Sequence, residues 1–176
     1  MKAMKTMKTC RLPSPLGEML LVANPDGTAL AGLYLANQKY FPDDAAQWDE
    51  APQLPLFRAA ATQLREYFAG ARTAFDLPLE PAGTPFQRQV WAAIAAIPFA
   101  ATITYGELAA RCGRPSAVRA AGAATGRNPL TIVVPCHRIV GSGGALTGYA
   151  GGLDRKRTLL GLERKPPASA AARRAA

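Results

Sequence analysis

Residues 132–140, with the sequence IVVPCHRIV, contain the side chains best suited to chemistry in this chain. They place Cys136 beside His137, the single histidine of the chain, between two β-branched apolar runs. Val and Ile favour extended, buried backbone, and Pro135 restricts the chain before the cysteine, so we expect the thiol on a rigid support at the end of a strand. The thiolate is the reactive form of cysteine and cationic neighbours favour it, so Cys-His-Arg is suggestive of an activated nucleophile.

Three other interpretations of this segment compete with a nucleophile. Free cysteine is commonly a core residue, so Cys136 could be structural and its histidine neighbour a coincidence. A zinc site lacks ligands, because one histidine and three scattered cysteines cannot form a local cluster, and we therefore expect no metal. A cysteine hydrolase would need the imidazole against the sulfur. Adjacent side chains of extended backbone point to opposite faces, so that geometry would require a bend or a bridging water.

The net charge of +9 is concentrated in the second half of the 176-residue chain. Residues 1–82 hold 8 Lys and Arg against 9 Asp and Glu, whereas residues 83–176 hold 13 against 3. A cationic excess on one half favours a polyanionic partner such as nucleic acid, because neutralised phosphates supply most sequence-independent affinity. Solubility is the alternative explanation, and part of the excess lies in residues 166–176, a basic tail whose composition predicts disorder.

Cysteine usage and hydropathy indicate the compartment. Three cysteines, an odd number with no C-x-x-C pair, argue against a disulfide framework and favour a reducing cytosol; Cys10 falls in what we expect to be a mobile start. The basic start is followed by RLPSPLGE rather than by the apolar run of a signal peptide. No apolar run approaches the roughly 20 residues that span a bilayer. The sequence therefore predicts a cytoplasmic protein with no membrane partner.

The first half predicts a small α+β unit over residues 1–82. Short apolar runs over 18–23 and 28–35 flank a turn and indicate a β-hairpin. Apolar residues at helical spacing predict an amphipathic helix over 56–68. A further strand is expected over 74–79, before prolines that mark a boundary.

The second half predicts a helical unit over residues 83–165. Thr84 and Thr104 each begin a capping-box pattern, so a helix is expected after each of them. Ser116 is expected to cap a third, alanine-rich helix, and the last two of these helices would form a helix-turn-helix. Helical hairpins that bind no DNA have the same pattern. A final helix is expected over 153–163.

The second half contains, in this order, the motifs GTPFQRQVW, TYGELAARCGRPSAVRAAG and TGRNPLTIVVPCHRIVGSGGALTGYAGGLDRKRTLLGLE. These motifs, above all PCHR with Asn-Pro upstream and GYAGG downstream, resemble the O6-alkylguanine–DNA alkyltransferases, close to their bacterial Ogt-type branch. The resemblance covers nearly all of residues 83–163, whereas the first half is similar mainly through LREYFAG. It implies an α+β protein with a small RNase H-like α/β domain over 1–82. A mainly helical, winged-helix-like DNA-binding domain would follow over 83–165.

The resemblance also implies roles for individual residues. Cys136 would accept the alkyl group, His137 would pass its proton through water, and Glu163 would orient the histidine. A carboxylate raises the basicity of a histidine, and a basic histidine promotes thiolate formation. Asn128 would tie together the turns around the site. Tyr105 would donate a hydrogen bond to the guanine ring as it leaves.

Further implied roles concern DNA and the alkyl pocket. Arg119 would enter the duplex and fill the gap left by a flipped nucleotide. Other expected DNA contacts are Ser116, Arg127 and Arg138. The expected lining of the pocket is Tyr149, Ala150, Gly148, Val134 and Pro135. Some members of the family have a serine where this chain has Ala150, so a hydrogen bond to the guanine oxygen would have to come from backbone amides.

The function implied is direct-reversal DNA repair. The alkyl group of O6-alkylguanine in double-stranded DNA would move irreversibly to Cys136, in a single turnover and without a cofactor, and O4-alkylthymine remains open as a second substrate. The protein would act as a monomer, with clustering along DNA left open. The alternative is a non-catalytic alkyltransferase-like lesion-binding protein. That protein would need no nucleophile, so a cysteine at 136 followed by His137, with Glu163 present, favours chemistry.

Overall fold

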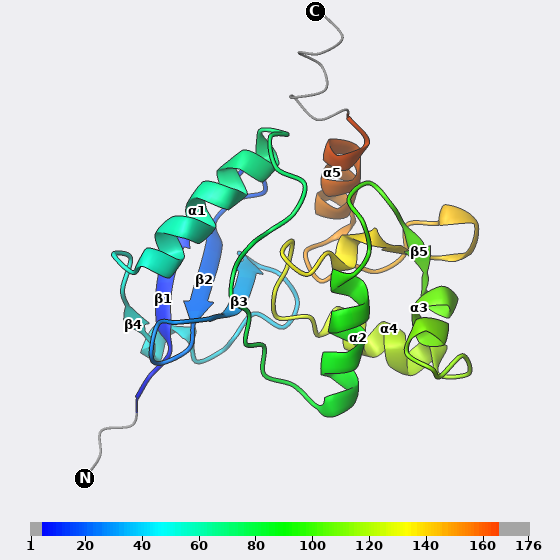
Figure 1. Cartoon of the computed structure of the whole chain (residues 1–176), viewed down its shortest axis with the longest axis horizontal. Helices are drawn as coiled ribbons and strands as arrows, with labels where there is room; N and C mark the ends of the chain where they lie inside the picture. The colour runs from blue at the N-terminus through cyan, green and yellow to red at the C-terminus, as the bar shows by residue number, and fades with distance from the viewer. Residues whose placement is uncertain (1–4, 166–176) are drawn as a thin grey trace, which may run out of the picture.

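The computed structural model describes residues 5–165 and has a mixed α+β fold in two parts (Figure 1). The N-terminal unit, residues 5–82, contains a four-stranded sheet and one long helix. The C-terminal unit, residues 83–165, consists mainly of helices with a two-stranded ribbon. The predicted fold class is confirmed. The tail expected to be disordered, 166–176, lies outside the described residues.

The sheet of the N-terminal unit has the strand order β3-β2-β1-β4. The strands β2 (Met19–Ala23) and β3 (Leu30–Leu35) form the predicted antiparallel hairpin. On its other side β2 pairs antiparallel with β1 (Lys8–Leu12), to which the short strand β4 (Asp49–Glu50) adds in parallel. Every residue of β2 is buried, as expected for a strand that has neighbours on both edges.

Helix α1 (Pro55–Phe68) is the predicted amphipathic helix and packs on the sheet (Figure 1). Proline at its first position costs no hydrogen bond, because the first N–H groups of a helix have no intrahelical partner. Tyr67, in the last turn, is 1% exposed. The expectation for Cys10 was wrong: it lies in β1 and is buried, because this segment pairs with β2 rather than fraying.

Residues 74–79 do not form the expected strand. They contribute one isolated bridge, between Leu79 and Leu30. The backbone of Asp76 is instead bonded to the side chain of Gln63, which donates to its carbonyl at 2.9 Å and accepts from its N–H at 2.8 Å. At Asp76 a side chain of α1 therefore takes the place of a strand neighbour, and pairing with β3 is limited to the bonds that Leu30 makes with Pro78 and Glu80.

The C-terminal unit begins with two capped helices. Thr84 precedes α2 (Pro85–Ala95) and Thr104 precedes α3 (Tyr105–Arg111), and each forms the complete capping box that the sequence predicted. The ribbon consists of β5 (Ile103–Thr104), directly before α3, paired in parallel with the strand β6 that follows Cys136. Among the described residues no helix is long and apolar enough to span a bilayer.

Helix α4 (Val118–Gly126) packs against α2 and α3 and forms the predicted helix-turn-helix with α3. Ser116 does not cap it as expected. The N-cap is Ala117, which makes no side-chain bond, because the helix begins one residue later than the sequence suggested and leaves Ser116 exposed in the turn. Helix α5 (Leu153–Arg164) ends one residue beyond its predicted limit.

Candidate active site

Cys136 lies in the wall of a cavity of about 340 Å³. The cavity opens between α4, the start of α3, the loop before α5 and the turn that follows β3. Its lining residues are Lys39, Tyr40, Tyr105, Gly122, Ala123, Thr125, Gly126, Cys136, Gly148, Tyr149 and Ala150. The sulfur-bearing residue is 6% exposed, so a substrate would have to enter the cavity to reach it.

The backbone bends at Cys136, where the sequence predicted a strand. Residues 131–133 form turns, and residues 136–138 form one turn of 3-10 helix before β6 (Ile139–Val140). The cysteine therefore precedes a strand rather than ending one. Ile132 has a φ of 74°, a left-handed conformation that a β-branched residue keeps only when its surroundings hold it there. Tertiary contacts thus override the β propensity of the run.

Asn128 holds this bend together. Its Nδ2 donates to the carbonyl of Val134 at 2.8 Å, and its Oδ1 accepts from the N–H of Leu130 at 3.0 Å. The side chain is buried, so both bonds satisfy groups that have no access to water. These contacts fit the expectation that Asn128 ties the turns around the site.

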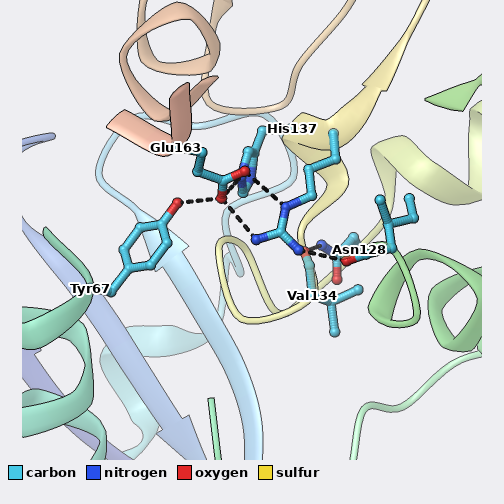
Figure 2. Close-up of polar contacts among 7 residues, drawn as sticks. Tyr67, Asn128, Val134, His137 and Glu163 are labelled. Carbon is cyan, nitrogen blue, oxygen red and sulfur yellow. Dashed lines mark hydrogen bonds and ion pairs between the residues drawn. The ribbon is translucent and has the colours of Figure 1, made fainter. Parts of the chain in front are cut away.

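Glu163 is the centre of a buried polar network (Figure 2). Its Oε1 accepts from the hydroxyl of Tyr67 at 2.7 Å and lies 2.7 Å from Nε2 of His137. Arg138 donates two hydrogen bonds of 2.9 Å to the same carboxylate, from Nε to Oε2 and from Nη2 to Oε1. The third nitrogen of this arginine, Nη1, donates to the carbonyl of Ile97 at 2.7 Å. Tyr67 comes from α1, so the N-terminal unit reaches into the site (Figure 2).

This network sets the protonation states of two of its members. Burial opposes ionisation of Glu163, but hydrogen bonds from His137, Arg138 and Tyr67 outweigh it and lower the pKa of Glu163 to about 2. Burial also lowers the pKa of His137, by more than the bond to Glu163 raises it. A neutral imidazole therefore donates from Nε2 to an ionised carboxylate. Its buried Nδ1 has a lone pair and no hydrogen bond to any residue between 5 and 165, which makes it the available base.

The thiol of Cys136 does not have the depressed pKa that its cationic neighbours suggested. Burial raises the pKa, and a bond with Asn128 and the charge of Lys156 reverse this only in part. Burial is the main reason that the pKa is raised, and Arg138 does not offset it because its guanidinium is bonded to Glu163. A thiol that is protonated at rest needs a base close by before it can attack.

Lys156 is a site residue that the sequence interpretation missed. It is fully buried, and its Nζ donates to the carbonyls of Ile139, Thr147 and Gly148 at 2.6, 2.9 and 3.2 Å. Lys156 therefore links the loop before α5, which lines the cavity, to the strand β6 that follows Cys136. A signal was present, because Lys156 precedes the predicted Glu163 by seven residues and so lies on the same buried face of α5.

The predicted pocket residues divide into two groups. Gly148, Tyr149 and Ala150 line the cavity as expected. Val134 and Pro135 do not: Val134 turns its carbonyl to Asn128, and Pro135 lines a separate hollow next to the end of α2. The lining that was missed comes from α4, most of which lies inside the recognised motifs, and from the turn after β3, which carried none.

The predicted DNA-binding residues also divide. Arg119 on α4 and Arg127 at its C-cap are exposed, as is Ser116. Arg138 is 6% exposed, and its guanidinium is occupied by Glu163 and a backbone carbonyl. A phosphate contact needs a cation free at the surface, so the DNA-binding role predicted for Arg138 was wrong. Its place is inside the buried polar network around Glu163.

Family models match both units of the chain. The model described as 6-O-methylguanine DNA methyltransferase, ribonuclease-like domain, matches residues 7–81. The model described as 6-O-methylguanine DNA methyltransferase, DNA binding domain, matches residues 85–165. The chain belongs to the 6-O-methylguanine DNA methyltransferase family. The family recognised from the sequence motifs is thereby confirmed.

Individual members of this methyltransferase family are similar to the chain over most of their length. A methylated-DNA–protein-cysteine methyltransferase of Mycolicibacterium paratuberculosis is 50% identical over 157 residues, which cover 89% of this chain and 92% of that protein. One from Methanosarcina acetivorans is 46% identical, with 85% and 94% covered. The structure of Mycobacterium tuberculosis OGT in complex with DNA superposes with a TM-score of 0.84 at 43% identity, covering 91% of this chain and 95% of that one.

Proposed function

We propose that this protein repairs DNA by direct reversal, moving the alkyl group of O6-alkylguanine irreversibly onto Cys136. The observation that carries the proposal is a buried thiol in a cavity wall, next to a neutral histidine whose Nδ1 is an available base. Family membership supports the reaction, and the relative solved with DNA supports DNA as the partner. The protein would act as a monomer on duplex DNA, with its two domains meeting at residues 82 and 83.

The proposed reaction begins with loss of the thiol proton. A water molecule passes this proton from Cys136 to Nδ1 of His137, and the ionised Glu163 at Nε2 stabilises the resulting imidazolium. The sulfur attacks the saturated carbon attached to O6. A carbon–sulfur bond forms while the carbon–oxygen bond breaks, and its electron pair leaves with the guanine.

The leaving guanine needs a proton, and Tyr105 can donate to its ring. Tyr105 lines the cavity, and within the described residues its hydroxyl makes a single long bond of 3.4 Å, to the carbonyl of Thr147, so it can turn to a substrate. A donor placed there offsets the negative charge that develops on the base. Tyr105 regains its proton from the imidazolium through water, which leaves neutral guanine, neutral histidine and an alkylated cysteine.

Access to the base would come from α4. A base inside a duplex cannot reach a buried sulfur, so the nucleotide must flip out of the stack. Arg119 is exposed near the start of this helix, where its neighbours are mostly alanine and glycine, so the helix can approach DNA closely. A lesion-binding protein without chemistry would need the same helix and arginine. It would have no use for the buried network around Glu163, so we favour the transferase.

The test is mass spectrometry after incubation with an oligonucleotide that contains O6-methylguanine. A methyl adduct is expected on the peptide that contains Cys136, and the amount repaired should stop at one lesion per protein molecule, because water does not displace a thioether. Cys136→Ala should bind the lesion without transfer. Cys112→Ala, which also removes a buried free cysteine, is the matched control and should retain transfer. Continued turnover beyond one equivalent would refute the proposal.

A further inference from the structure

The turn that follows β3 brings the N-terminal unit to the mouth of the cavity, where its cyan ribbon lies between the two units (Figure 1). Lys39 and Tyr40 from this turn line the cavity together with the residues of the C-terminal unit. The backbone N–H of Lys39 donates to the carbonyl of Ala150, in the loop before α5, at 2.8 Å. One side of the entrance is therefore built by the sheet unit.

The turn is held rigidly in this position. The buried side chain of Gln38 accepts from the N–H of Leu35 at 2.7 Å and from the hydroxyl of Thr131 at 3.3 Å, which joins the turn to both units. Tyr40 has a φ of 62°, a conformation that bulky residues rarely adopt. Residues held in such conformations persist where surrounding contacts over-determine them, and they are frequent at ligand sites.

Two cationic side chains make cation–π contacts with the ring of Tyr40. The guanidinium carbon of Arg127 lies 3.7 Å from the ring centroid, and Nζ of Lys39 lies 4.9 Å from it. Both side chains are exposed, and Tyr40 itself is 43% exposed. Within residues 5–165 neither cation forms an ion pair with a carboxylate. Two like charges on one ring repel each other, and an anion bound between them would relieve this repulsion.

We propose that Lys39, Tyr40 and Arg127 form a phosphate-binding rim that holds the backbone of the flipped nucleotide at the mouth of the cavity. This inference rests on the proposed function. When the base occupies the cavity, its own phosphates must remain outside the entrance, next to this rim. Arg119 is eight residues before Arg127, about 12 Å along the helix at 1.5 Å per residue, so the two arginines serve different parts of the DNA. The N-terminal unit thus binds substrate directly through Lys39.

The test is the salt dependence of binding to duplex DNA that contains O6-methylguanine. Each phosphate contact contributes about 0.9 to the slope of log affinity against log salt for duplex DNA and about 0.7 for single strands. Lys39→Gln should therefore lower the magnitude of the slope by about 0.7 to 0.9, and the same change at Arg127 should lower it by a similar amount. Between about 50 and about 200 mM salt, wild-type affinity should fall about threefold more than that of either variant.

Two further variants separate charge from structure. Lys39→Arg keeps the charge and should restore the wild-type slope. Lys5→Gln removes a lysine of the same unit that pairs with Asp26, in the hairpin turn at the other end of β3, and should leave the slope unchanged. The rate of transfer should also fall more for duplex DNA than for free O6-benzylguanine when Lys39 is replaced, because only the duplex offers a phosphate.

The outcomes distinguish this inference from the proposed function. If the wild-type protein transfers the methyl group and Lys39→Gln leaves the salt slope unchanged, the rim does not bind phosphate, whatever happens to the rate. Equal losses on duplex DNA and on the free base would likewise assign Lys39 to the structure of the entrance alone. A wild-type protein that transfers nothing to Cys136 would instead overturn the proposed function.

Discussion

The substitution Glu163→Gln tests whether the buried network works through charge or only through shape. Glutamine has nearly the same volume as glutamate, so the packing around α5 should persist. The carboxylate accepts from Tyr67 and Arg138 and lies beside His137, whereas a carboxamide offers one acceptor oxygen and a donor nitrogen. In the variant the buried guanidinium of Arg138 loses its counter-ion, and the imidazole of His137 loses the charge that stabilises its protonated form.

The cost in stability follows from the pKa of Glu163. Its fall from an ordinary value of 4.5 to about 2 corresponds to about 3 kcal/mol of folding free energy at neutral pH. Removing one partner of a buried ion pair costs about 3 to 5 kcal/mol, which agrees with that magnitude. Because the folded-state pKa is lowered, this stability is present above pH 4.5 and is lost as the pH falls towards 2. The difference between wild type and variant should shrink to about 1.5 kcal/mol at pH 3.

The assay is urea unfolding of both proteins at pH 7, 5 and 3, together with the rate of transfer from free O6-benzylguanine at pH 7. The variant should transfer about 10- to 100-fold more slowly, the loss known for partners that orient metal-binding histidines, because Glu163 bonds His137 in the same way. Glu18→Gln makes the same chemical change in an exposed ion pair with Arg11 and should alter stability by less than about 0.5 kcal/mol. A Glu163→Gln protein within 1 kcal/mol of wild type at pH 7, with an undiminished rate, would refute the reasoning.

Four other predictions follow from the same geometry. Tyr67→Phe removes one of several donors to Glu163 and should cost about 1.5 kcal/mol in urea unfolding, with the carboxylate still ionised; no loss would show that the bond contributes nothing. Lys156→Met leaves three buried carbonyls without their donor, so we expect about 2 kcal/mol of destabilisation and slower transfer from the free base; a rate equal to wild type would show that the loop needs no such fastening. Arg119→Ala should slow repair of duplex DNA much more than reaction with the free base, and equal losses would remove it from the duplex-opening role. Because the pKa of His137 is lowered from its ordinary 6.5 and that of Cys136 is raised from its ordinary 9.0, the transfer rate should stay level from pH 6.5 to pH 9, fall only at a more acidic pH where His137 gains a proton, and rise only above pH 9; a tenfold rise per pH unit from pH 6.5 would indicate direct thiolate formation without the histidine.

Local elements were predictable wherever one short stretch of sequence contained the whole signal. The capping boxes at Thr84 and Thr104, the amphipathic pattern of α1 and the hairpin turn between β2 and β3 each depend on neighbours within a few residues. Where partners come from a distance, prediction failed. The strand expected over 74–79 pairs with β3 only at Leu30, while a glutamine on α1 bonds the backbone of Asp76. Strand β1 was missed because its pairing with β2 has no local signature.

The active site shows the same division. The ordered motifs around Cys136, His137 and Glu163 were sufficient to identify the family and the reaction, because they stand at recognisable positions along the chain. Which charges those groups bear was decided by the tertiary structure. Burial raises the pKa of the Cys136 thiol and lowers that of His137. The extent of burial cannot be predicted from the residues next to them in the sequence.

Contacts across the two units were also outside the reach of the sequence. Arg138 directly follows Cys136 and His137 in the sequence and was expected at DNA, but folding turns it onto Glu163. Tyr67 and Lys39 belong to the unit with the weaker resemblance, and folding brings one to the carboxylate and the other to the cavity mouth. The sequence by itself determined the chemistry and those helices and strands whose signals lie within a few residues, such as α1, α2, α3 and the β2–β3 hairpin. Only the packing of distant segments decided the protonation states and which cations face the substrate, because both depend on burial and on partners that the chain brings together after folding.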